Sequence, residues 1–571
     1  MSSYTYTNFR YSGKQPAPLD KQSKRSRIVL FIFIALFLVL LVRAFYILLC
    51  NGHFLQNQGE ARFCRELTLH ATRGVITDRN GALLAVSARV ESIWASPSSM
   101  EKVSHQQLKR LAHLLNILPS TIQAKLADKK REFVYIKRHI APELANRVMQ
   151  LGIPGIASQV EYRRFYPTGE LFAHAVGFTG VDKIGQEGLE LAYNDKLAGQ
   201  NGKRVVLKDR LGHIVDDLTD VTLPKNGQKL ILSMDQKLQY LAYRELRRGV
   251  VENKAKSGSV VVLDAQTGEI LAMANYPSYN PNNRQTTRSL QWRNSAITDL
   301  TEPGSTIKPI LVSKAIDSGK VTPHTVLNTN SYTINGAVVR DVKTHRSLDV
   351  ANIVQKSSNV GVSKLALMFS SREMWHFYHT VGFGRSLDSG FPGESAGRLR
   401  NPVNWRPIEQ ATMSFGYGVA ASLLQMARAY TIFTTSGKLM PVSFAKVSMP
   451  AEGEQVIANS TARQMRQMLT IVGQPSIQIS GYHVAGKSGT VRKLENGVYQ
   501  PNKHASLFIG FAPALSKPRF IVAVMIDEPH AGFYYGTTVA GPIFSRIMNG
   551  CLRSFDVAPD MSINNLLTVA D

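Results

Sequence analysis

A serine and a lysine in the segment EPGSTIKP, Glu302 to Pro309, have the types and spacing of a nucleophile and its base. Pro303 and Gly304 break the preceding chain, so we expect Ser305 to open a helix, with Lys308 one turn later on the same face. A serine hydroxyl is a poor nucleophile until a base takes its proton. A lysine can be that base when desolvation and nearby cations lower its pKa. The partial positive charge at a helix start also favours a developing alkoxide.

The serine–lysine spacing is not specific by itself. It recurs at Ser99–Lys102 and at Ser443–Lys446, where no neighbouring feature supports it. A short motif of this kind needs companions before it indicates a site.

A second hydroxyl and an amide side chain follow in the segment VQKSSNVGV. Here Ser357 could relay a proton, and the side chain of Asn359 could hold the backbone of a peptide substrate. Taken alone, the same residues also fit an ordinary surface turn.

The segment HVAGKSGTVRK reads as the edge of a strand, which could pair with an extended peptide substrate. The cation of Lys487 could hold a terminal carboxylate or keep the base lysine neutral. We assign Ser488, Gly489 and Thr490 to the substrate-binding and oxyanion part of the site, where the glycine allows close approach. The backbone N–H groups of Ser305 and Thr490 would then be the oxyanion donors.

The order of these segments makes them specific as a set. The gaps between them are roughly 50 and 130 residues, and the set is that of penicillin-binding proteins and class A β-lactamases. A further lysine–serine–glycine segment at Lys256–Gly258 is interpreted as the entry to a strand, without a catalytic role.

The sequence pattern around these residues predicts an α+β catalytic module over residues 224–556, whose helices and strands would position them. Alternating apolar residues indicate a strand pair at its start and further strands near its end, with helical periodicity between them. This order is expected when an antiparallel sheet packs against helices from both ends of the chain. The predicted elements are two strands within Ser257–Pro277 around a turn at Gln266–Gly268, a helix at Leu423–Phe433, strands at Ser506–Pro513 and Arg519–Asp527, and a last helix at Gly541–Asn549.

Apart from the unsupported pair Ser99–Lys102, residues 50–223 contain no obvious nucleophile, metal cluster or phosphate loop, and we predict a non-catalytic support module. The segment from Arg73 to Ser87 predicts two short strands around an Asn80-Gly81 hairpin turn. Helical periodicity runs from Gln106 to Leu126.

An apolar run at residues 28–49 is long enough to cross a bilayer as a helix. Residues 1–27 are polar and rich in lysine and arginine, which predicts a cytoplasmic tail and places the chain after residue 50 outside the membrane. No small-residue cleavage site follows, so we expect an anchor and not a cleaved signal peptide. Arg43 lies near the outer end, where its side chain can snorkel to the headgroups. The alternative for Arg43 is contact with a polytopic membrane partner.

Length, charge and cysteine content bound the function further. A chain of 571 residues has room for two or more folded units. The formal charge of +26 would suit nucleic acid, but the basic residues are scattered and no nucleic-acid motif accompanies them. We expect instead a basic surface that faces an anionic envelope polymer. The cysteines Cys50, Cys64 and Cys551 are too few for a disulfide framework or a structural zinc site.

With these motifs the chain resembles a class B penicillin-binding protein from the anchor to about residue 550. Glu302 before Pro-Gly-Ser, Asn280 to Asn282, and a tyrosine–glycine segment before the last helix resemble division-type members of that family. The segments that carry the wider resemblance are Arg73-Gly74, Asp78 to Gly81, Arg163 to Gly180 and Gly185 to Glu190 for the family's pedestal, and Pro277 to Asn282, Arg293 to Pro309, Ser414 to Gly418 and Tyr534 to Phe544 for its catalytic module.

The resemblance implies a D,D-transpeptidase of the bacterial cytoplasmic (inner) membrane, with a single span, a periplasmic catalytic domain and a C-terminal tail at 557–571. Ser305 would attack the penultimate D-alanine of a stem pentapeptide ending in D-Ala-D-Ala, and Lys308 would take its proton. An amine from a neighbouring stem would complete the cross-link, and β-lactams would acylate the same serine. An FtsW-type glycan polymerase and other divisome proteins are the implied partners. No metal or organic cofactor is implied.

Several alternatives remain beside this interpretation. Ser358 stands where β-lactamases have aspartate, and Ser488 where many relatives have threonine. Both departures are common in class B proteins and count against a β-lactamase. The alternatives are an elongation-type class B transpeptidase, a hydrolase such as a carboxypeptidase, a β-lactam-binding sensor, and a catalytically inactive divisome scaffold.

Overall fold

The computed structural model describes residues 20–50, 54, 64–100, 103–208, 214–217, 221–285, 291–449 and 451–561. The chain forms two compact units, Met1–His70 with Asn201–Pro224, and Ala71–Gln200 with Lys225–Asp571. Lys102 of the second serine–lysine pair, most of the predicted cytoplasmic tail and most of the predicted C-terminal tail lie outside the described residues. The predicted limits of the pedestal and of the catalytic module stay predictions.

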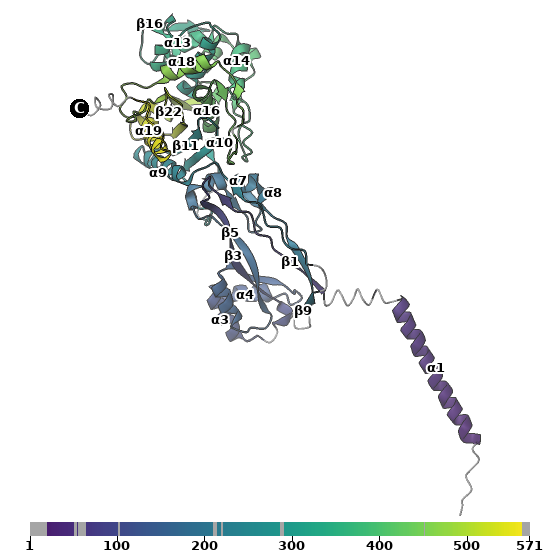
Figure 1. Cartoon of the computed structure of the whole chain (residues 1–571). Helices are drawn as coiled ribbons and strands as arrows, with labels where there is room; N and C mark the ends of the chain where they lie inside the picture. Colours follow the sequence, from purple (N-terminus) through teal and green to yellow (C-terminus); the bar gives the residue numbers. More distant parts are fainter. Residues whose placement is uncertain are drawn as a thin grey trace, which may run out of the picture. The chain divides into compact units, whose positions relative to one another are not determined.

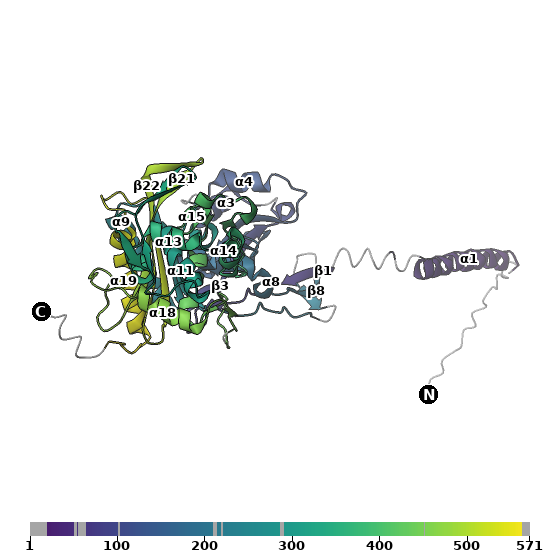
Figure 2. The same ribbon diagram turned by 90° about the horizontal axis from the view of Figure 1, so that it is seen from above.

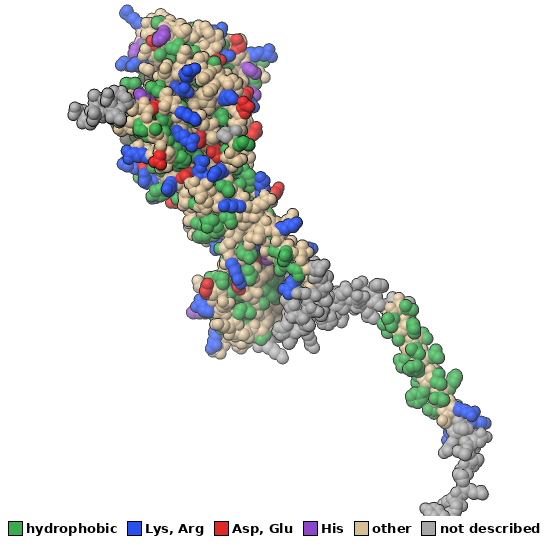
Figure 3. Space-filling model, viewed as in Figure 1, with side chains coloured by type: hydrophobic (Ala, Val, Ile, Leu, Met, Phe, Trp, Pro, Cys, Tyr) green, Lys and Arg blue, Asp and Glu red, His purple; other side chains and the backbone are tan. Residues whose placement is uncertain are grey.

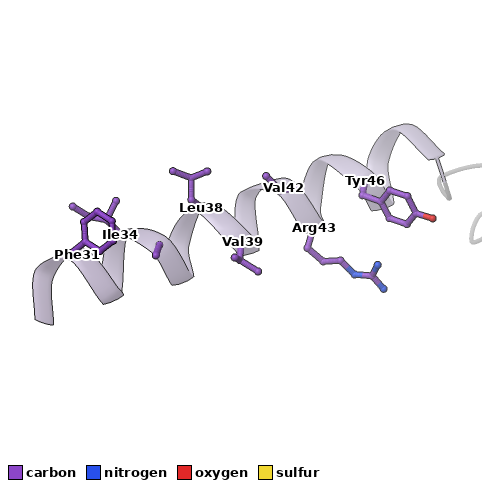
Figure 4. A pocket seen from close by; sticks show the side chains of 8 residues that line it. Phe31, Ile34, Leu38, Val39, Val42, Arg43 and Tyr46 are labelled. Carbon is purple, nitrogen blue, oxygen red and sulfur yellow. The ribbon is translucent and has the colours of Figure 1, made fainter. Parts of the chain in front are cut away.

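The smaller unit contains the predicted anchor as helix α1, Asp20–Cys50. Its stretch Lys24–Leu49 has a mean hydropathy of 3.1 and is not covered by other parts of the chain, as expected for a helix that crosses a bilayer. Positively charged side chains gather at one end of this apolar helix (Figure 3). Farther along it, the guanidinium carbon of Arg43 lies 5.4 Å from the ring centroid of Tyr46, and both side chains leave the helix on the same side (Figure 4).

The smaller unit also contains an antiparallel sheet in the strand order β1-β8-β9. Its strands are β1 (Cys64–Leu69), β8 (Gly202–Lys208) and β9 (Ile214–Asp217). The register pairs Cys64 with Leu207 and Leu69 with Gly202. Segments far apart in the sequence therefore form this sheet together.

The pedestal part of the larger unit is organised by a long strand, β3 (Leu83–Ala95). It pairs antiparallel with β2 (Ile76–Thr77), β4 (Val134–Ile140) and β5 (Ile156–Phe165), and β5 runs beside it over its length (Figure 1). The Asp78 carboxylate accepts the N–H groups of Asn80 and Ala82 at 2.8 Å, and Gly81 has a φ of 94°. This confirms the predicted hairpin turn.

The predicted helix from Gln106 to Leu126 is divided in the structure. It forms α3 (His105–Leu115) and α4 (Pro119–Leu126). The break has two local causes, since Asn116 adopts a left-handed φ of 49° and Pro119 cannot continue the helical hydrogen bonds. Together with α5 (Pro142–Met149), these helices pack on strands β3, β4 and β5 around a small apolar core.

A buried ionic cluster ties three segments of the pedestal together. The carboxylate of Glu190 accepts Arg73 Nε and Arg164 Nε, each at 2.6 Å, and all three side chains are at most 3% exposed. Arg73 also donates to the backbone oxygen of Glu190 at 2.7 Å. A buried carboxylate is tolerated when it is paired in this way.

The catalytic part is built on an antiparallel sheet in the order β12-β11-β23-β22-β21. Helices α9 (Gln236–Glu252) and α19 (Gly536–Ser554) pack on one face, and helices of the middle of the chain lie on the other (Figure 2). The predicted α+β fold is thereby confirmed, although the last helix is longer than expected. The strands are β11 (Ser257–Asp264), β12 (Ile270–Tyr276), β21 (Ala485–Glu495), β22 (Val498–Ala512) and β23 (Phe520–Asp527).

The predicted helix Leu423–Phe433 is also divided, into α16 (Leu423–Ala429) and α17 (Thr431–Thr434). The hydroxyl of Thr431 donates to the backbone oxygen of Arg428 at 2.7 Å, a local bond that competes with a regular helix. The other helices and strands of the larger unit are α6 (Ala173–Val176), α7 (Gly188–Ala192), α8 (Asn194–Leu197), α10 (Ser295–Thr298), α11 (Lys308–Asp317), α12 (Val350–Gln355), α13 (Asn359–Ala366), α14 (Ser371–Thr380), α15 (Pro407–Met413), α18 (Asn459–Leu469), β6 (Phe178–Thr179), β7 (Gly185–Glu187), β10 (Leu230–Ile231), β13 (Val326–Asn328), β14 (Tyr332–Ile334), β15 (Ala337–Val339), β16 (Ser347–Asp349), β17 (Arg398–Leu399), β18 (Val419–Ala420), β19 (Lys438–Leu439) and β20 (Glu454–Gln455).

Candidate active site

The predicted nucleophile lies in a tight turn before helix α11. Ser305 belongs to a 3₁₀ turn, Gly304–Ile307, and the α-helix begins only at Lys308. The predicted helix thus begins within one residue of Ser305, but its first turn is of the 3₁₀ type and not of the α type. The cause is Pro309, which has no N–H to give the carbonyl of Ser305 an α-helical bond, so Lys308 N donates to it instead.

Lys308 is buried beneath this turn, with 1% of its surface exposed. Its Nζ donates to Ser357 O at 2.6 Å, Ser357 Oγ at 3.2 Å and Asn359 Oδ1 at 2.7 Å. Burial, followed by the charge of Lys487, holds the pKa of Lys308 well below its usual value, and the charge of Asp341 opposes this. A lysine in this environment can lose its proton at a pH where an exposed lysine cannot.

The serine–serine–asparagine segment forms the end of the turn after helix α12 and the first residue of helix α13. Ser357 has a positive φ of 57°, and its hydroxyl donates to Ser305 Oγ at 3.1 Å. The predicted nucleophile, hydroxyl relay and base are therefore consecutive in one hydrogen-bonded chain. The side chain of Asn359 is held between Lys308 and the backbone oxygen of Arg340, to which it donates at 3.3 Å.

Asp341 is a site residue that the sequence motifs do not mark. Its carboxylate accepts the hydroxyl of Ser358 at 2.6 Å and the backbone N–H of Val360 at 2.9 Å. Ser358 also caps helix α13 by accepting from Gly361 N at 2.8 Å. Asp341 thus fixes the turn that carries Ser357. No sequence motif marks Asp341, because it lies in an irregular segment 17 residues before Ser358 and meets it only in the folded chain.

Lys487 lies on β21, which ends the strand order of the sheet, as the sequence predicts for an edge strand. Only 7% of its surface is exposed, and its Nζ donates to Ser488 O at 3.1 Å. Burial lowers the pKa of Lys487 to about 8. Although the two lysines come from distant segments of the chain, the charge of Lys487 lowers the pKa of Lys308.

The rest of the edge-strand motif brings β21 close to the nucleophile turn. A Cβ on Gly489 would lie 3.0 Å from Pro303 O and from Thr306 Cγ2, so a side chain there would push the strand away. The hydroxyl of Thr490 accepts the N–H of Gly536 at 3.0 Å, which ties the strand to the start of α19. Ser488 is partly exposed on the same strand.

Glu302 has a structural partner that the sequence does not predict. Its carboxylate accepts Gly418 N at 2.8 Å and the hydroxyl of Tyr499 at 3.0 Å, so it links the nucleophile turn to the loop before β18 and to strand β22. Burial raises the pKa of Glu302, and these two hydrogen bonds act against that rise.

The other matches to the motifs have structural roles. Ser443 donates to Ala445 O at 2.8 Å, and Lys446 donates to Arg79 O at 3.2 Å, so this pair does not form a nucleophile and base. Lys256 pairs with Glu528 at 3.0 Å beside the start of β11, as expected for a strand entry. Among the described residues, no group of three or more histidine, cysteine, aspartate and glutamate side chains could hold a metal ion.

Comparisons with known proteins identify the domains and the family of the chain. The family model for the penicillin-binding protein transpeptidase domain matches residues 258–549, and the model for the penicillin-binding protein dimerisation domain matches residues 68–232. The probable peptidoglycan D,D-transpeptidase PenA of Neisseria meningitidis is 49% identical over 543 residues, 94% of this chain and 93% of that protein.

Two further relatives extend the comparison to other bacteria. The peptidoglycan D,D-transpeptidase FtsI of Escherichia coli is 41% identical over 531 residues, 91% of this chain and 90% of that protein. The probable peptidoglycan D,D-transpeptidase PbpC of Pseudomonas aeruginosa is 40% identical over 561 residues, 97% of this chain and 99% of that protein. The chain therefore belongs to the class B penicillin-binding proteins, the serine-type peptidoglycan D,D-transpeptidases.

Proposed function

We propose that this chain cross-links peptidoglycan stem peptides at the division septum through an acyl-enzyme on Ser305. The observation that carries the proposal is the hydrogen-bonded chain from Lys308 Nζ to Ser357 Oγ, at 3.2 Å, and from there to Ser305 Oγ, at 3.1 Å. It joins a hydroxyl nucleophile to a buried amine that can exist in its neutral form.

In the acylation step, Ser305 Oγ bonds to the carbonyl carbon of the penultimate D-alanine. Its proton passes to the hydroxyl of Ser357, which gives its own proton to neutral Lys308. The bond from that carbonyl carbon to the nitrogen of the terminal D-alanine then breaks. The leaving amine takes the proton back from Lys308, so the base is restored for the next step.

In the second step, an amine of a neighbouring stem attacks the ester on Ser305. Lys308 accepts a proton from that amine, and Ser305 regains its own as the cross-linking amide forms. A β-lactam would enter by the first step and remain as an ester on Ser305. The same groups therefore account for cross-linking and for penicillin binding.

Substrate recognition in this proposal uses the edge of the sheet. An extended stem peptide can add alongside β21 by backbone hydrogen bonds. The buried cation of Lys487 is suited to a terminal carboxylate, and Asn359 to the peptide backbone. The N–H groups of Ser305 and Thr490 would hold the oxyanion. The close approach of Gly489 to Pro303 supports a narrow site between the strand and the turn.

The orientation of the chain in the membrane follows from the charged residues that flank the anchor helix. The residues Lys24, Arg25 and Arg27 precede the apolar stretch of α1, and a positive flank stays in the cytoplasm. We therefore assign the catalytic module to the periplasm. The partner proposed for the span and the pedestal is a polytopic glycan polymerase of the FtsW type, with other divisome proteins. Glu302 and the Asn280 to Asn282 segment favour the division type over the elongation type.

The reaction is tested by incubating the purified full-length chain with a stem pentapeptide donor and an amine acceptor, and by mass spectrometry of the products. We expect a cross-linked product and free D-alanine. Ser305→Ala should give neither product, whereas Ser443→Ala should behave as the wild type. Release of D-alanine without any cross-link, with acceptor in excess, would make the chain a carboxypeptidase.

The cellular role is tested by exchanging residues 28–49 for an unrelated spanning helix. The variant should still bind penicillin but support septum formation poorly, because the polymerase would no longer recognise the span. Full complementation by the exchanged anchor would reduce the helix to a tether. Loss of rod elongation, instead of septation, on depletion of the protein would move it to the elongation type.

A further inference from the structure

A cationic pocket lies where the pedestal strands meet the start of the catalytic module, and it shares no lining residue with the active site. Its volume is about 510 Å³, the size of a small-ligand site. Residues of β4 and β5, of the segment 179–183 and of the loop 281–285 line it. None of the described lining residues carries a carboxylate, whereas the basic ones are His139, Arg163, Arg164, Lys183 and Arg284.

Arg164 supplies a donor that the protein itself does not satisfy. The side chain is 3% exposed, and its Nε is paired with Glu190 at 2.6 Å. Its Nη2 is buried, and no acceptor among the described residues lies within hydrogen-bond distance. Buried guanidinium donors are normally satisfied, so an orphan on a residue that lines a pocket indicates a missing acceptor.

Lys183 adds a positive charge that the pocket does not balance. Its Nζ lies 5.5 Å from the ring centroid of Tyr162, and burial lowers its pKa. The carboxylate that favours its charged form is Glu161, which already accepts Arg138 at 3.1 Å and the hydroxyl of Tyr135 at 3.0 Å. Among the described residues, no carboxylate lies within ion-pair distance of Lys183.

The side of the pocket formed by the loop is fixed by the protein rather than by a ligand. The side-chain amide of Asn282 accepts the backbone N–H of Tyr166 at 3.0 Å and donates to the backbone oxygen of Tyr166 at 2.9 Å. The backbone carbonyl of Asn282 accepts Arg163 Nη2 at 3.3 Å. The pocket is therefore preformed between two parts of the chain. The side-chain amides of Asn283 and Gln285 also line it.

These groups identify the chemistry of the occupant. Guanidinium and ammonium groups bind carboxylate and phosphate oxygens, and arginine does so with a planar fork. Side-chain amides and a tyrosine beside these cations match a peptide carboxylate and its neighbouring amides better than a bare phosphate. The volume accommodates the end of a peptide but not a folded domain.

We propose that this pocket binds the free C-terminal carboxylate of a stem peptide, and so forms a non-catalytic docking site for peptidoglycan. The identity of the peptide rests on the proposed function, whereas the assignment of an anion site does not. Cross-linking converts the carboxyl end of the donor stem into an amide, so a site of this kind would retain stems that still end in a free carboxylate beside the enzyme while the active site takes a new donor.

The test measures binding of a fluorescent stem tetrapeptide, which ends in a single D-alanine, to the full-length chain in detergent micelles. Ser305→Ala protein, or protein acylated first with benzylpenicillin, is used so that the active site makes no covalent product. Fluorescence anisotropy should give saturable binding. Lys183→Gln and Arg163→Gln should each weaken it at least fivefold, whereas Lys109→Gln, at an exposed lysine of α3, should leave it unchanged.

The controls separate the proposal from its rivals. Amidation of the C-terminal carboxylate of the probe should abolish binding, and the penicillin acylation rate of Lys183→Gln with native Ser305 should match the wild type. Absence of saturable binding, equal affinity in Lys183→Gln, or equal binding of the amidated probe would overturn the proposal. Displacement of the probe by inorganic phosphate at concentrations below those of competing unlabelled tetrapeptide would also overturn it. Because this probe needs no reaction at Ser305, loss of transpeptidation leaves the result unaffected.

Discussion

Replacing Lys487 by methionine should stabilise the folded chain at pH 7 even though it removes a group proposed for catalysis. Burial lowers the pKa of Lys487 from 10.5 to about 8, a difference of about 2.5. At ~1.4 kcal/mol per pKa unit, the charged form costs about 3 kcal/mol in the folded state. Loss of the hydrogen bond to Ser488 O offsets about 1 kcal/mol of this gain. We therefore expect the variant to be more stable by about 2 kcal/mol at pH 7.

The stability difference between Lys487→Met and the wild type should depend on pH, in a direction set by the lowered pKa of Lys487. Between pH 8 and the usual pKa of 10.5, the folded state releases the Lys487 proton while the unfolded state still holds it. The wild type therefore gains stability as the pH rises through this window. The advantage of Lys487→Met should shrink accordingly and be lost near pH 10.5. The measurement is urea unfolding followed by tryptophan fluorescence at pH 7 and at pH 10, with Lys109→Met as the exposed-lysine control.

Kinetics provide a second readout of the same substitution. The charge of Lys487 lowers the pKa of Lys308, so its removal should move the acidic limb of the penicillin acylation profile to higher pH. Two results would refute the stability prediction: a Lys487→Met variant less stable than the wild type at pH 7, or a stability difference that is the same at both pH values.

Three further substitutions test other contacts of the site and the pedestal. Asp341→Asn keeps an oxygen that can accept the hydroxyl of Ser358 but removes a negative charge that raises the pKa of Lys308. The acidic limb of the penicillin acylation profile should therefore move to lower pH, and a shift to higher pH would contradict this. Glu190→Gln leaves its two buried arginine partners without a counter-charge and should cost about 3–5 kcal/mol in urea unfolding, against less than 1 kcal/mol expected for an exposed pair. Gly489→Ala should slow penicillin acylation about tenfold, equivalent to ~1.4 kcal/mol in the barrier, because its Cβ would crowd Pro303 O at 3.0 Å; an unchanged rate with unchanged stability would show that the approach of strand and turn is not needed.

Much of the site could be predicted because its residues lie in short segments in which the side-chain types indicate a nucleophile and a base. The hydroxyl of Ser305, the amine of Lys308 and the hydroxyl of Ser357 are each recognisable without a structure, and the structure brings them into one hydrogen-bonded chain. Strands β11, β12, β22 and β23 were predictable because their apolar residues run continuously or alternate over short stretches bounded by turn residues, whereas β21 was predicted from its lysine–serine–glycine motif.

The groups that could not be predicted depend on contacts between distant segments. Asp341 acts only through its position beside Ser358, and Glu302 through a hydroxyl on a strand far along the chain. No local pattern encodes either contact. The predicted helix boundaries differ from the observed ones for local reasons. The left-handed φ of Asn116 ends one helix early, and the missing N–H of Pro309 makes the turn that contains Ser305 a 3₁₀ turn.

The most direct test of the central claim is the position of the covalent penicillin adduct. The full-length chain is labelled with benzylpenicillin at pH 7, digested, and analysed by tandem mass spectrometry. We expect one ester, on Ser305, that is absent from Ser305→Ala and retained in Ser443→Ala. An adduct on another serine, or undiminished labelling of Ser305→Ala, would contradict it.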